Sequence, residues 1–218
     1  MDIDTANKLK SFFSQHRLLQ YKKGELLLRA EDDPSGVYYL DEGIVDQYVI
    51  TDKGDEFIVA FHEPFAIFPL SWALNDSHNI FFYEALTPAS LYRAPKSEFL
   101  KFIEGDPQVI LILLKSEIKI ADEMLSRTMY LTEGTVRKRL IAVLMSGAKR
   151  FCTKTSENSV TFDFKILEAK LASTIGTTPE SLSRELKSLK EKGLIQFNKN
   201  ILTITDINEL EDERLQSS

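Results

Sequence analysis

Four polar side chains near the carboxyl end of the chain recur at the spacing of one face of an α-helix. They are Glu180, Ser183, Arg184 and Lys187. An arginine can donate two hydrogen bonds to O6 and N7 of guanine, a glutamate can accept one from N4 of cytosine, and a serine is short enough to approach a base edge. This combination predicts a helix that reads base pairs in DNA. The alternative is an ordinary solvated, charged helix face.

The sequence around this face predicts two short helices joined by a tight turn. The first helix turns Leu167, Leu171 and Ile175 to one side. It ends at Gly176, because glycine tolerates the positive φ of a helix C-terminus. The second begins at Thr178, whose side chain can cap the helix, and continues to Lys192. Two helices joined by a glycine-containing turn are typical of a DNA-binding helix-turn-helix.

A wing and a set of phosphate contacts complete this prediction. Two short strands are expected over residues 194–197 and 201–204, and together they would form a hairpin. Side chains that bond to phosphates position such a domain on DNA without reading its sequence. The candidates for this role are Thr178, Lys170, Lys187 and Lys199. The carboxyl end is therefore interpreted as a winged helix-turn-helix.

The charge of the chain differs between its two parts. The whole chain of 218 residues has a formal net charge of −6, which by itself argues weakly against a nucleic-acid partner. Residues 1–134 hold 13 basic and 22 acidic side chains, a net charge of −9. Residues 135–205 hold 13 basic and 6 acidic side chains, a net charge of +7, before an acidic tail begins at Asp206. This asymmetry favours an acidic module joined to a DNA-binding one.

The first hundred residues have the pattern of a β-rich domain. A short amphipathic helix is expected over residues 5–15. Short runs rich in Val, Ile, Tyr and Phe then alternate with glycine-containing turns, which is typical of an antiparallel β-sandwich or jelly roll. The runs span residues 25–29, 37–40, 45–50, 57–61 and 90–93. With the helices that follow, the predicted fold class is α+β.

A long helix is predicted from Pro107 onward, since proline is accepted in a first helical turn. Apolar and small residues recur in it at alternating intervals of three and four, the spacing of a coiled-coil seam. The seam consists of Leu111, Leu114, Ile118, Ala121, Leu125 and Thr128. So long a helix would extend beyond a small sandwich. We therefore favour a dimer helix over a helix that packs only against its own sandwich.

A break in the helical pattern before Thr135 separates this helix from the next one. Thr135 can cap that next helix, which is expected over residues 136–149, and the polar segment 151–160 is expected to be a loop. The break would act as a hinge that sets the spacing of the two reading helices in a dimer. The predicted domains are a sensor over 1–104, a dimerisation helix over 105–133 and a DNA-binding domain over 134–218.

Together these features resemble the CRP/FNR superfamily of bacterial transcription regulators over nearly all of the chain. The resemblance includes glycine-punctuated strands such as Lys23-Gly24-Glu25, the long helix and the winged helix-turn-helix. Residues 180–184, Glu-Ser-Leu-Ser-Arg, are similar to the E-x-x-S-R pattern of the FNR branch. The resemblance implies that Glu180, Ser183 and Arg184 read a half-site similar to TTGAT in an inverted repeat. It also implies a homodimer on a double-stranded DNA operator and, for an activator, contact with RNA polymerase.

The stretch that binds a cyclic phosphate in members of this family differs here. Phe68-Pro69 stands in place of a Gly-Glu pair, and no arginine occurs between Arg29 and Arg93. A cyclic phosphate needs a cation and backbone donors, so cyclic AMP is not expected as the effector. The N-terminal cysteine cluster of FNR-type oxygen sensors is absent too, because the only cysteine is Cys152. An iron–sulfur cluster is therefore excluded.

An aromatic-rich region takes the place of that stretch. The candidate effector-pocket residues are Phe61, Phe68, Trp72, Tyr83 and Met124. They suit an apolar small-molecule effector or a planar cofactor such as haem, with His62 or His78 as its axial ligand. By resemblance to gas-sensing relatives in the family, a haem-containing protein would be a regulator that senses nitric oxide or carbon monoxide. Two alternatives stay open: these side chains are the core of the sandwich, or the protein binds DNA without any effector.

Other classes of protein are disfavoured by the composition. Cys152 lies in the expected polar loop with no nearby histidine, and neither paired carboxylates nor a histidine cluster indicate an enzyme or a metal site. A single cysteine also excludes a disulfide framework. No apolar run approaches the roughly 18 residues of a membrane span. The amino end is charged and has no signal-peptide stretch, so we expect a cytoplasmic protein with no membrane partner.

Overall fold

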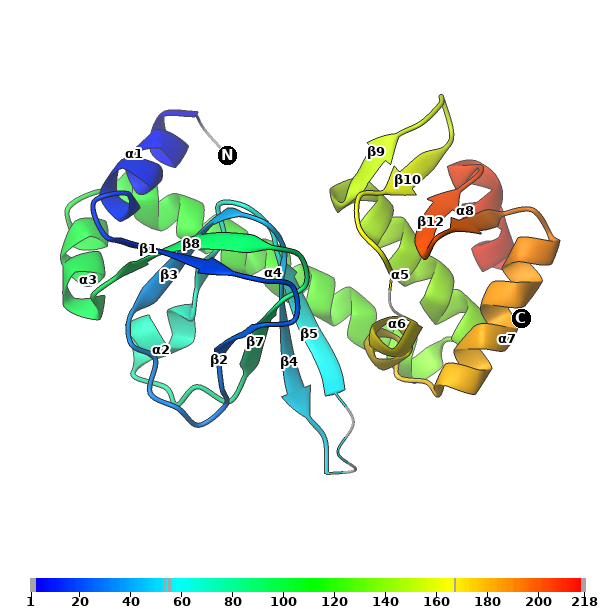
Figure 1. Ribbon diagram of the computed structural model, residues 1–218, viewed down its shortest axis with the longest axis horizontal. Helices are drawn as coiled ribbons and strands as arrows, with labels where there is room; N and C mark the ends of the chain where they lie inside the picture. Colours follow the sequence, from blue (N-terminus) through cyan, green and yellow to red (C-terminus); the bar gives the residue numbers. More distant parts are fainter. Residues whose placement is uncertain (1–2, 53, 55, 167, 217–218) are drawn as a thin grey trace. The chain divides into compact units, whose positions relative to one another are not determined.

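The computed structural model describes residues 3–216 with the exception of residues 53, 55 and 167 (Figure 1). The chain forms two compact units. The first consists of residues 1–51 and 58–122, and the second of residues 52–57 and 123–218. Helix α4 (Pro107–Glu133) begins in the first unit and ends in the second. Among the described residues, no helix is both long enough and apolar enough to cross a membrane.

The first unit is built on two four-stranded sheets, of order β1-β8-β3-β6 and β2-β7-β4-β5. The pairs β1–β8, β8–β3, β3–β6, β2–β7 and β7–β4 are all antiparallel. The strands are β1 (Arg17–Tyr21), β2 (Leu26–Leu28), β3 (Val37–Glu42), β4 (Val45–Ile50), β5 (Glu56–His62), β6 (Ile67–Phe68), β7 (Phe82–Ala85) and β8 (Ala89–Ala94). The predicted antiparallel sandwich is confirmed, and β4 has the predicted bounds.

Gly43 shows why a glycine is needed in the turn that joins β3 to β4. Its φ is +93°, a region that side chains with a Cβ rarely adopt. A Cβ at this position would collide with the carbonyl oxygen of Pro88 and with Ala89 at the start of β8. The glycine therefore lets two turns of the sandwich approach closely.

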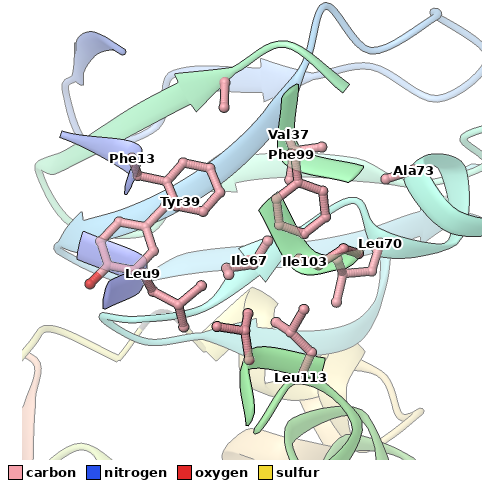
Figure 2. Close-up of a cluster of buried hydrophobic side chains, with 12 residues drawn as sticks. Leu9, Phe13, Val37, Tyr39, Ile67, Leu70, Ala73, Phe99, Ile103 and Leu113 are labelled. Atoms are coloured by element: carbon pink, nitrogen blue, oxygen red, sulfur yellow. The ribbon is translucent and has the colours of Figure 1, made fainter. Parts of the chain in front are cut away.

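Two apolar layers hold the first unit together. Residues from both sheets, including Leu40, Val45 and Leu91, fill the space between the sheets. The outer face of the sheet that contains β3 is covered by helices. These are α1 (Ile3–Phe13), α2 (Leu70–Asn75), α3 (Lys96–Glu104) and the start of α4. Figure 2 shows this second layer, in which Phe13, Tyr39 and Phe99 are fully buried.

The second unit combines four helices with a small sheet of order β11-β12-β10-β9. The elements are α5 (Val136–Arg150), β9 (Cys152–Lys154), β10 (Val160–Phe162), α6 (Glu168–Thr174), α7 (Pro179–Glu191), β11 (Ile195–Asn198), β12 (Ile201–Ile204) and α8 (Ile207–Gln216). Thr135 caps α5 as predicted, since its Oγ1 accepts a hydrogen bond from the backbone N–H of Lys138 at 3.3 Å. The helix-turn-helix and its wing hairpin are also confirmed, as α6, α7, β11 and β12.

Two expectations for this unit were wrong. The segment 151–160 is only partly a loop, because residues 152–154 form β9, which pairs with β10 and extends the wing sheet, while residues 155–159 connect the two strands. Val160 and Phe162 are buried while Thr161 between them is not, a period-two pattern that the polar residues around it obscured. The acidic segment after Asp206 is not a tail either. It forms α8, whose Leu210 is fully buried.

Candidate nucleic-acid interface

Helix α7 presents the polar face that the sequence predicts. Its apolar face, with Leu182, Leu186 and Leu189, is buried in the unit. The residues on the opposite side are all exposed, and they are Glu180, Ser183, Arg184 and Lys187. Because buried and exposed residues follow the same helical period, packing of the leucines places the four polar side chains together in solvent.

The N-terminus of α7 is capped by the side chain that precedes it. Thr178 Oγ1 accepts a hydrogen bond from the backbone N–H of Ser181 at 3.3 Å, and Pro179 occupies the first helical position. Capping of this kind contributes roughly 1 kcal/mol to helix stability. The start of the helix is therefore rigid at the point where Glu180 and Arg184 leave it.

The charges on this face are complementary to base edges. The backbone N–H of Glu180 itself, the hydroxyl of Thr178 and the charge of Arg184 hold the pKa of the Glu180 carboxyl below its usual range. Arg184 is exposed, and its Nη2 donates to Ser181 Oγ at 3.2 Å. At neutral pH one side chain thus only accepts hydrogen bonds and the other only donates them. That pair suits cytosine and guanine.

Three of the four candidate phosphate contacts are exposed. Thr178 lies at the start of α7, and Lys187 has 78% of its side chain exposed. Lys199 lies in the turn between β11 and β12, where it and Asn200 both have positive φ, as the tight turns of hairpins require. Lys170 differs, because only 15% of its side chain is exposed and its Nζ lies 3.1 Å from a carboxylate oxygen of Glu56.

The residues that anchor α7 were not found by sequence reasoning. Arg137 at the start of α5 forms hydrogen bonds to Glu185 and Ser188 of α7 and to Glu213 of α8. The acceptors lie between 48 and 76 positions further along the chain. No local pattern of spacing signals such contacts.

Helix α4 has one apolar face that is buried and another that is exposed. Val109 and Leu113 are buried against the first unit. Every residue of the predicted seam is exposed, and the seam comprises Leu111, Leu114, Ile118, Ala121, Leu125 and Thr128. The exposed fraction is 52% for Leu114 and 63% for Leu125. An exposed apolar stripe of this length is typical of surfaces that bind another protein chain.

The predicted effector-pocket residues do not come together as a group. The rings of Phe68 and Tyr83 stack 4.9 Å apart at 7° between the two sheets. Trp72 packs instead with the helical layer on the other side of the sheet, and its Nε1 donates to Asp33 at 2.7 Å. Phe61 is half-buried, and Met124 is exposed on α4.

The two candidate haem ligands are placed differently. His62 is buried, its ring lies 4.8 Å from that of Phe68, and its Nε2 lies 3.0 Å from Gln47 Oε1. His78 is exposed. The ring of His62 is packed against those of Phe68 and Tyr83 inside the sandwich, so a haem bound to it would require these side chains to move. Among the described residues, no group of three or more His, Cys, Asp or Glu side chains is arranged to hold a metal ion.

The first unit has a hollow on its surface. The hollow has a volume of about 280 Å³ and is lined by Leu26, Leu27, Leu28, Arg29, Asp32, Asp33, Ser35 and Tyr38. None of the predicted effector-pocket residues lines it.

Cys152 is half-buried, and burial together with the nearby Asp163 raises the pKa of its thiol to about 12. The thiol is therefore protonated and unreactive at neutral pH.

Comparison with known proteins supports two domains. Residues 18–106 match the family described as the cyclic nucleotide-binding domain, and residues 138–213 match the Crp-like helix-turn-helix domain. The anaerobic regulatory protein of Haemophilus influenzae is 27% identical over 193 residues, which are 87% of this chain and 73% of that protein. The global nitrogen regulator of a Nostoc species is 24% identical over 84% of this chain and 83% of its own.

Solved structures have the same fold. FixK2 from Bradyrhizobium japonicum superposes with a TM-score of 0.77 at 20% identity, over 90% of this chain and 96% of that one. A CRP/FNR-family transcriptional regulator from Thermus thermophilus gives a TM-score of 0.75 at 19% identity, over 93% of this chain and all of the other. The matched families and relatives are regulators of transcription and not enzymes.

Proposed function

The chain belongs to the CRP/FNR superfamily of transcription regulators, and from that premise we propose that it acts as a homodimer on an inverted DNA repeat. The observation that carries this proposal is the exposed face of α7, with Glu180, Ser183 and Arg184 opposite a buried leucine face. Each protomer would read one half-site similar to TTGAT. Arg184 would bind the guanine, and Glu180 would bind the cytosine paired with it.

Pairing along α4 supplies the second half of this proposal. Two copies joined through the exposed seam would present two copies of α7 to successive major grooves, about 34 Å apart along the duplex. Phosphate contacts from Thr178, Lys187 and Lys199 would fix the register of each protomer on the DNA. For an activator, RNA polymerase would be a further partner.

Selection from a pool of random duplex DNA tests the proposed function. We expect the full-length protein to enrich an inverted repeat whose half-sites are one helical turn apart. A duplex with this repeat should bind at least about 10³-fold more tightly than a scrambled duplex at physiological salt. Failure to enrich any sequence, or enrichment of a single asymmetric site, would contradict the proposal. Binding should be measured at several salt concentrations, because phosphate contacts alone are strongly salt-dependent.

A second candidate is a regulator that binds DNA without any effector. The stacked rings of Phe68 and Tyr83, with His62 beside them, favour it because they fill the space between the sheets. A sensor of an apolar small molecule would have to displace these rings. A haem-based sensor with His62 as its axial ligand is favoured less, since its ring is buried against Phe68.

Cyclic AMP is expected neither to bind nor to alter operator affinity. The stretch 30–92 contains no arginine to hold a cyclic phosphate, and aromatic rings fill the interior of the sandwich. Isothermal titration of the full-length protein with cyclic AMP should therefore give no binding heat, and the operator dissociation constant should be the same with and without it. Binding at micromolar concentration would refute this expectation.

An absorption spectrum of the purified protein tests haem separately, because bound haem gives a Soret band.

A further inference from the structure

One cluster of polar side chains joins three helices of the second unit. We call it the Arg137 cluster, and it consists of Arg137, Glu185, Ser188, Lys192 and Glu213. Arg137 belongs to the first turn of α5, the next three residues belong to α7 or its C-cap, and Glu213 belongs to α8. The cluster is distinct from the exposed face that would contact DNA.

The guanidinium of Arg137 makes three hydrogen bonds in three directions. Its Nε donates to Glu185 Oε2, its Nη1 to Glu213 Oε1 and its Nη2 to Ser188 Oγ, each at 2.7 Å. The pKa of Arg137 is raised, chiefly by its hydrogen bond to Glu185 and also by Glu213. The three bonds use three different nitrogens of a rigid plane, whereas the three donors of a lysine ammonium all sit on one nitrogen and match acceptors in such different directions less well.

The cluster also holds the far end of α7. Lys192 is the C-cap of that helix, and its Nζ donates to both carboxylate oxygens of Glu213 at 2.7 Å. Glu213 therefore bonds to α5 through Arg137 and to the end of α7 through Lys192. The side chain of Glu213 is only 14% exposed and that of Arg137 only 22%. Salt screens partly buried pairs of this kind less than exposed ones.

Apolar packing sets the rotation of α7 about its axis only coarsely, by turning the leucine face inward. Leu182, Leu186 and Leu189 fix the position of the helix, but apolar contacts have no preferred direction. Hydrogen bonds are directional, so the two bonds from Arg137 to Glu185 and Ser188 of α7 resist small rotations of the helix about its axis. Base reading depends on this rotation, because Glu180 and Arg184 must reach base edges within about 3 Å.

We propose that Arg137 is a positioning residue for base reading: it fixes the rotation of α7 against α5 and thereby sets how well the protein selects its operator. The inference rests on the proposed function. Arg137 does not touch DNA and acts through Glu185, the neighbour of Arg184 in α7. Since Arg137 follows the cap residue Thr135 closely, it also joins the segment after the hinge directly to the reading helix.

Arg137→Lys tests the proposal, because it keeps the positive charge and removes the fork. We expect operator affinity to fall about tenfold, with unchanged affinity for a scrambled duplex and an unchanged dependence on salt. Arg139→Lys is the matched control: the same change in the same helix, at a residue whose Nε has no hydrogen-bond partner among the described residues. The control should leave both affinities as they are. Thermal unfolding of both variants should be measured alongside.

Three results would count against the proposal. If Arg137→Lys lowers the affinity for operator and for scrambled DNA equally, Arg137 acts through folding or through its charge and not through positioning. If the operator affinity is unchanged, α7 is held in place without Arg137. Failure of the unaltered protein to distinguish operator from scrambled DNA would refute the proposed function itself. If Arg137→Lys does not fold, Ser188→Ala removes one acceptor without exposing a charge. It should lower selectivity about threefold.

Discussion

Replacing Leu114 and Leu125 of helix α4 together by glutamate is expected to convert the protein to a monomer. Both leucines are exposed in the single chain, at 52% and 63%, and lie in the predicted seam. In a dimer the change would bring four carboxylates into an apolar interface, and burying unpaired charges costs several kcal/mol per ion. Sedimentation should show one species with the mass of a single chain, 24.9 kDa.

Loss of the dimer should also weaken binding to the operator. A dimer binds its second half-site as an intramolecular step, and linkage of this kind typically raises overall affinity by about 10²–10⁴-fold. The double variant should lose operator affinity by a factor in that range. Its affinity for an isolated half-site should not change, because α7 lies in the second unit and keeps its packing.

Ser116→Glu is the matched control for the seam. Ser116 is also exposed on α4, but two residues from Leu114 it points to nearly the opposite side of the helix. This variant should stay dimeric and keep its operator affinity. A dimer that survives in the double variant would refute the seam, and a monomer with full operator affinity would refute the need for a dimer.

Local sequence signals predicted much of the fold. The strand over residues 45–50 has the predicted bounds, and both cap residues, Thr135 and Thr178, accept the expected hydrogen bonds. Such features depend on a few neighbouring residues, so a single sequence contains them. Helix α8 had such a signal too, because Asp206 Oδ1 accepts from the backbone N–H groups of Asn208 and Glu209. The acidic composition of the segment concealed it.

The reading face was predictable for a similar reason. Helical periodicity relates the leucines of α7 to the polar side chains opposite them, and the structure follows that period. The Arg137 cluster was not predictable, because its partners meet only when α5, α7 and α8 pack together. Sequence spacing has no information about which of many charged residues will meet at such distances along the chain.

The positions of the aromatic residues in the first unit could be predicted only in part, for a different reason. Phe68 and Trp72 are only four positions apart, yet they pack on opposite sides of one sheet. Strand β6 ends at Phe68 and α2 begins at Leu70, so the period that decides which side a residue faces changes between them. Composition indicated an aromatic interior, but it did not indicate which rings would share it.

Replacing Arg184 by alanine is expected to relax the choice of base at one position of each half-site. The guanidinium would donate two hydrogen bonds to guanine, and one such contact provides about 1–3 kcal/mol of discrimination. Preference for guanine at that position should therefore fall by roughly 5- to 150-fold per half-site. The fold should persist, since the one hydrogen bond that the Arg184 side chain makes in the described structure is to the exposed hydroxyl of Ser181. Competition binding with all four base pairs at this position measures the effect.

Lys187→Ala separates base reading from simple loss of positive charge, because Lys187 lies three residues further along the same exposed face. A phosphate contact carries no sequence information, so this variant should weaken binding to operator and scrambled DNA to the same extent. Loss of one such contact in each protomer should also reduce the slope of log affinity against log salt by about 1.8 for the dimer. Arg184→Ala should instead change the order of preferred bases. If both variants weaken binding uniformly and keep that order, Arg184 contacts the backbone and the guanine of the half-site is read by another residue.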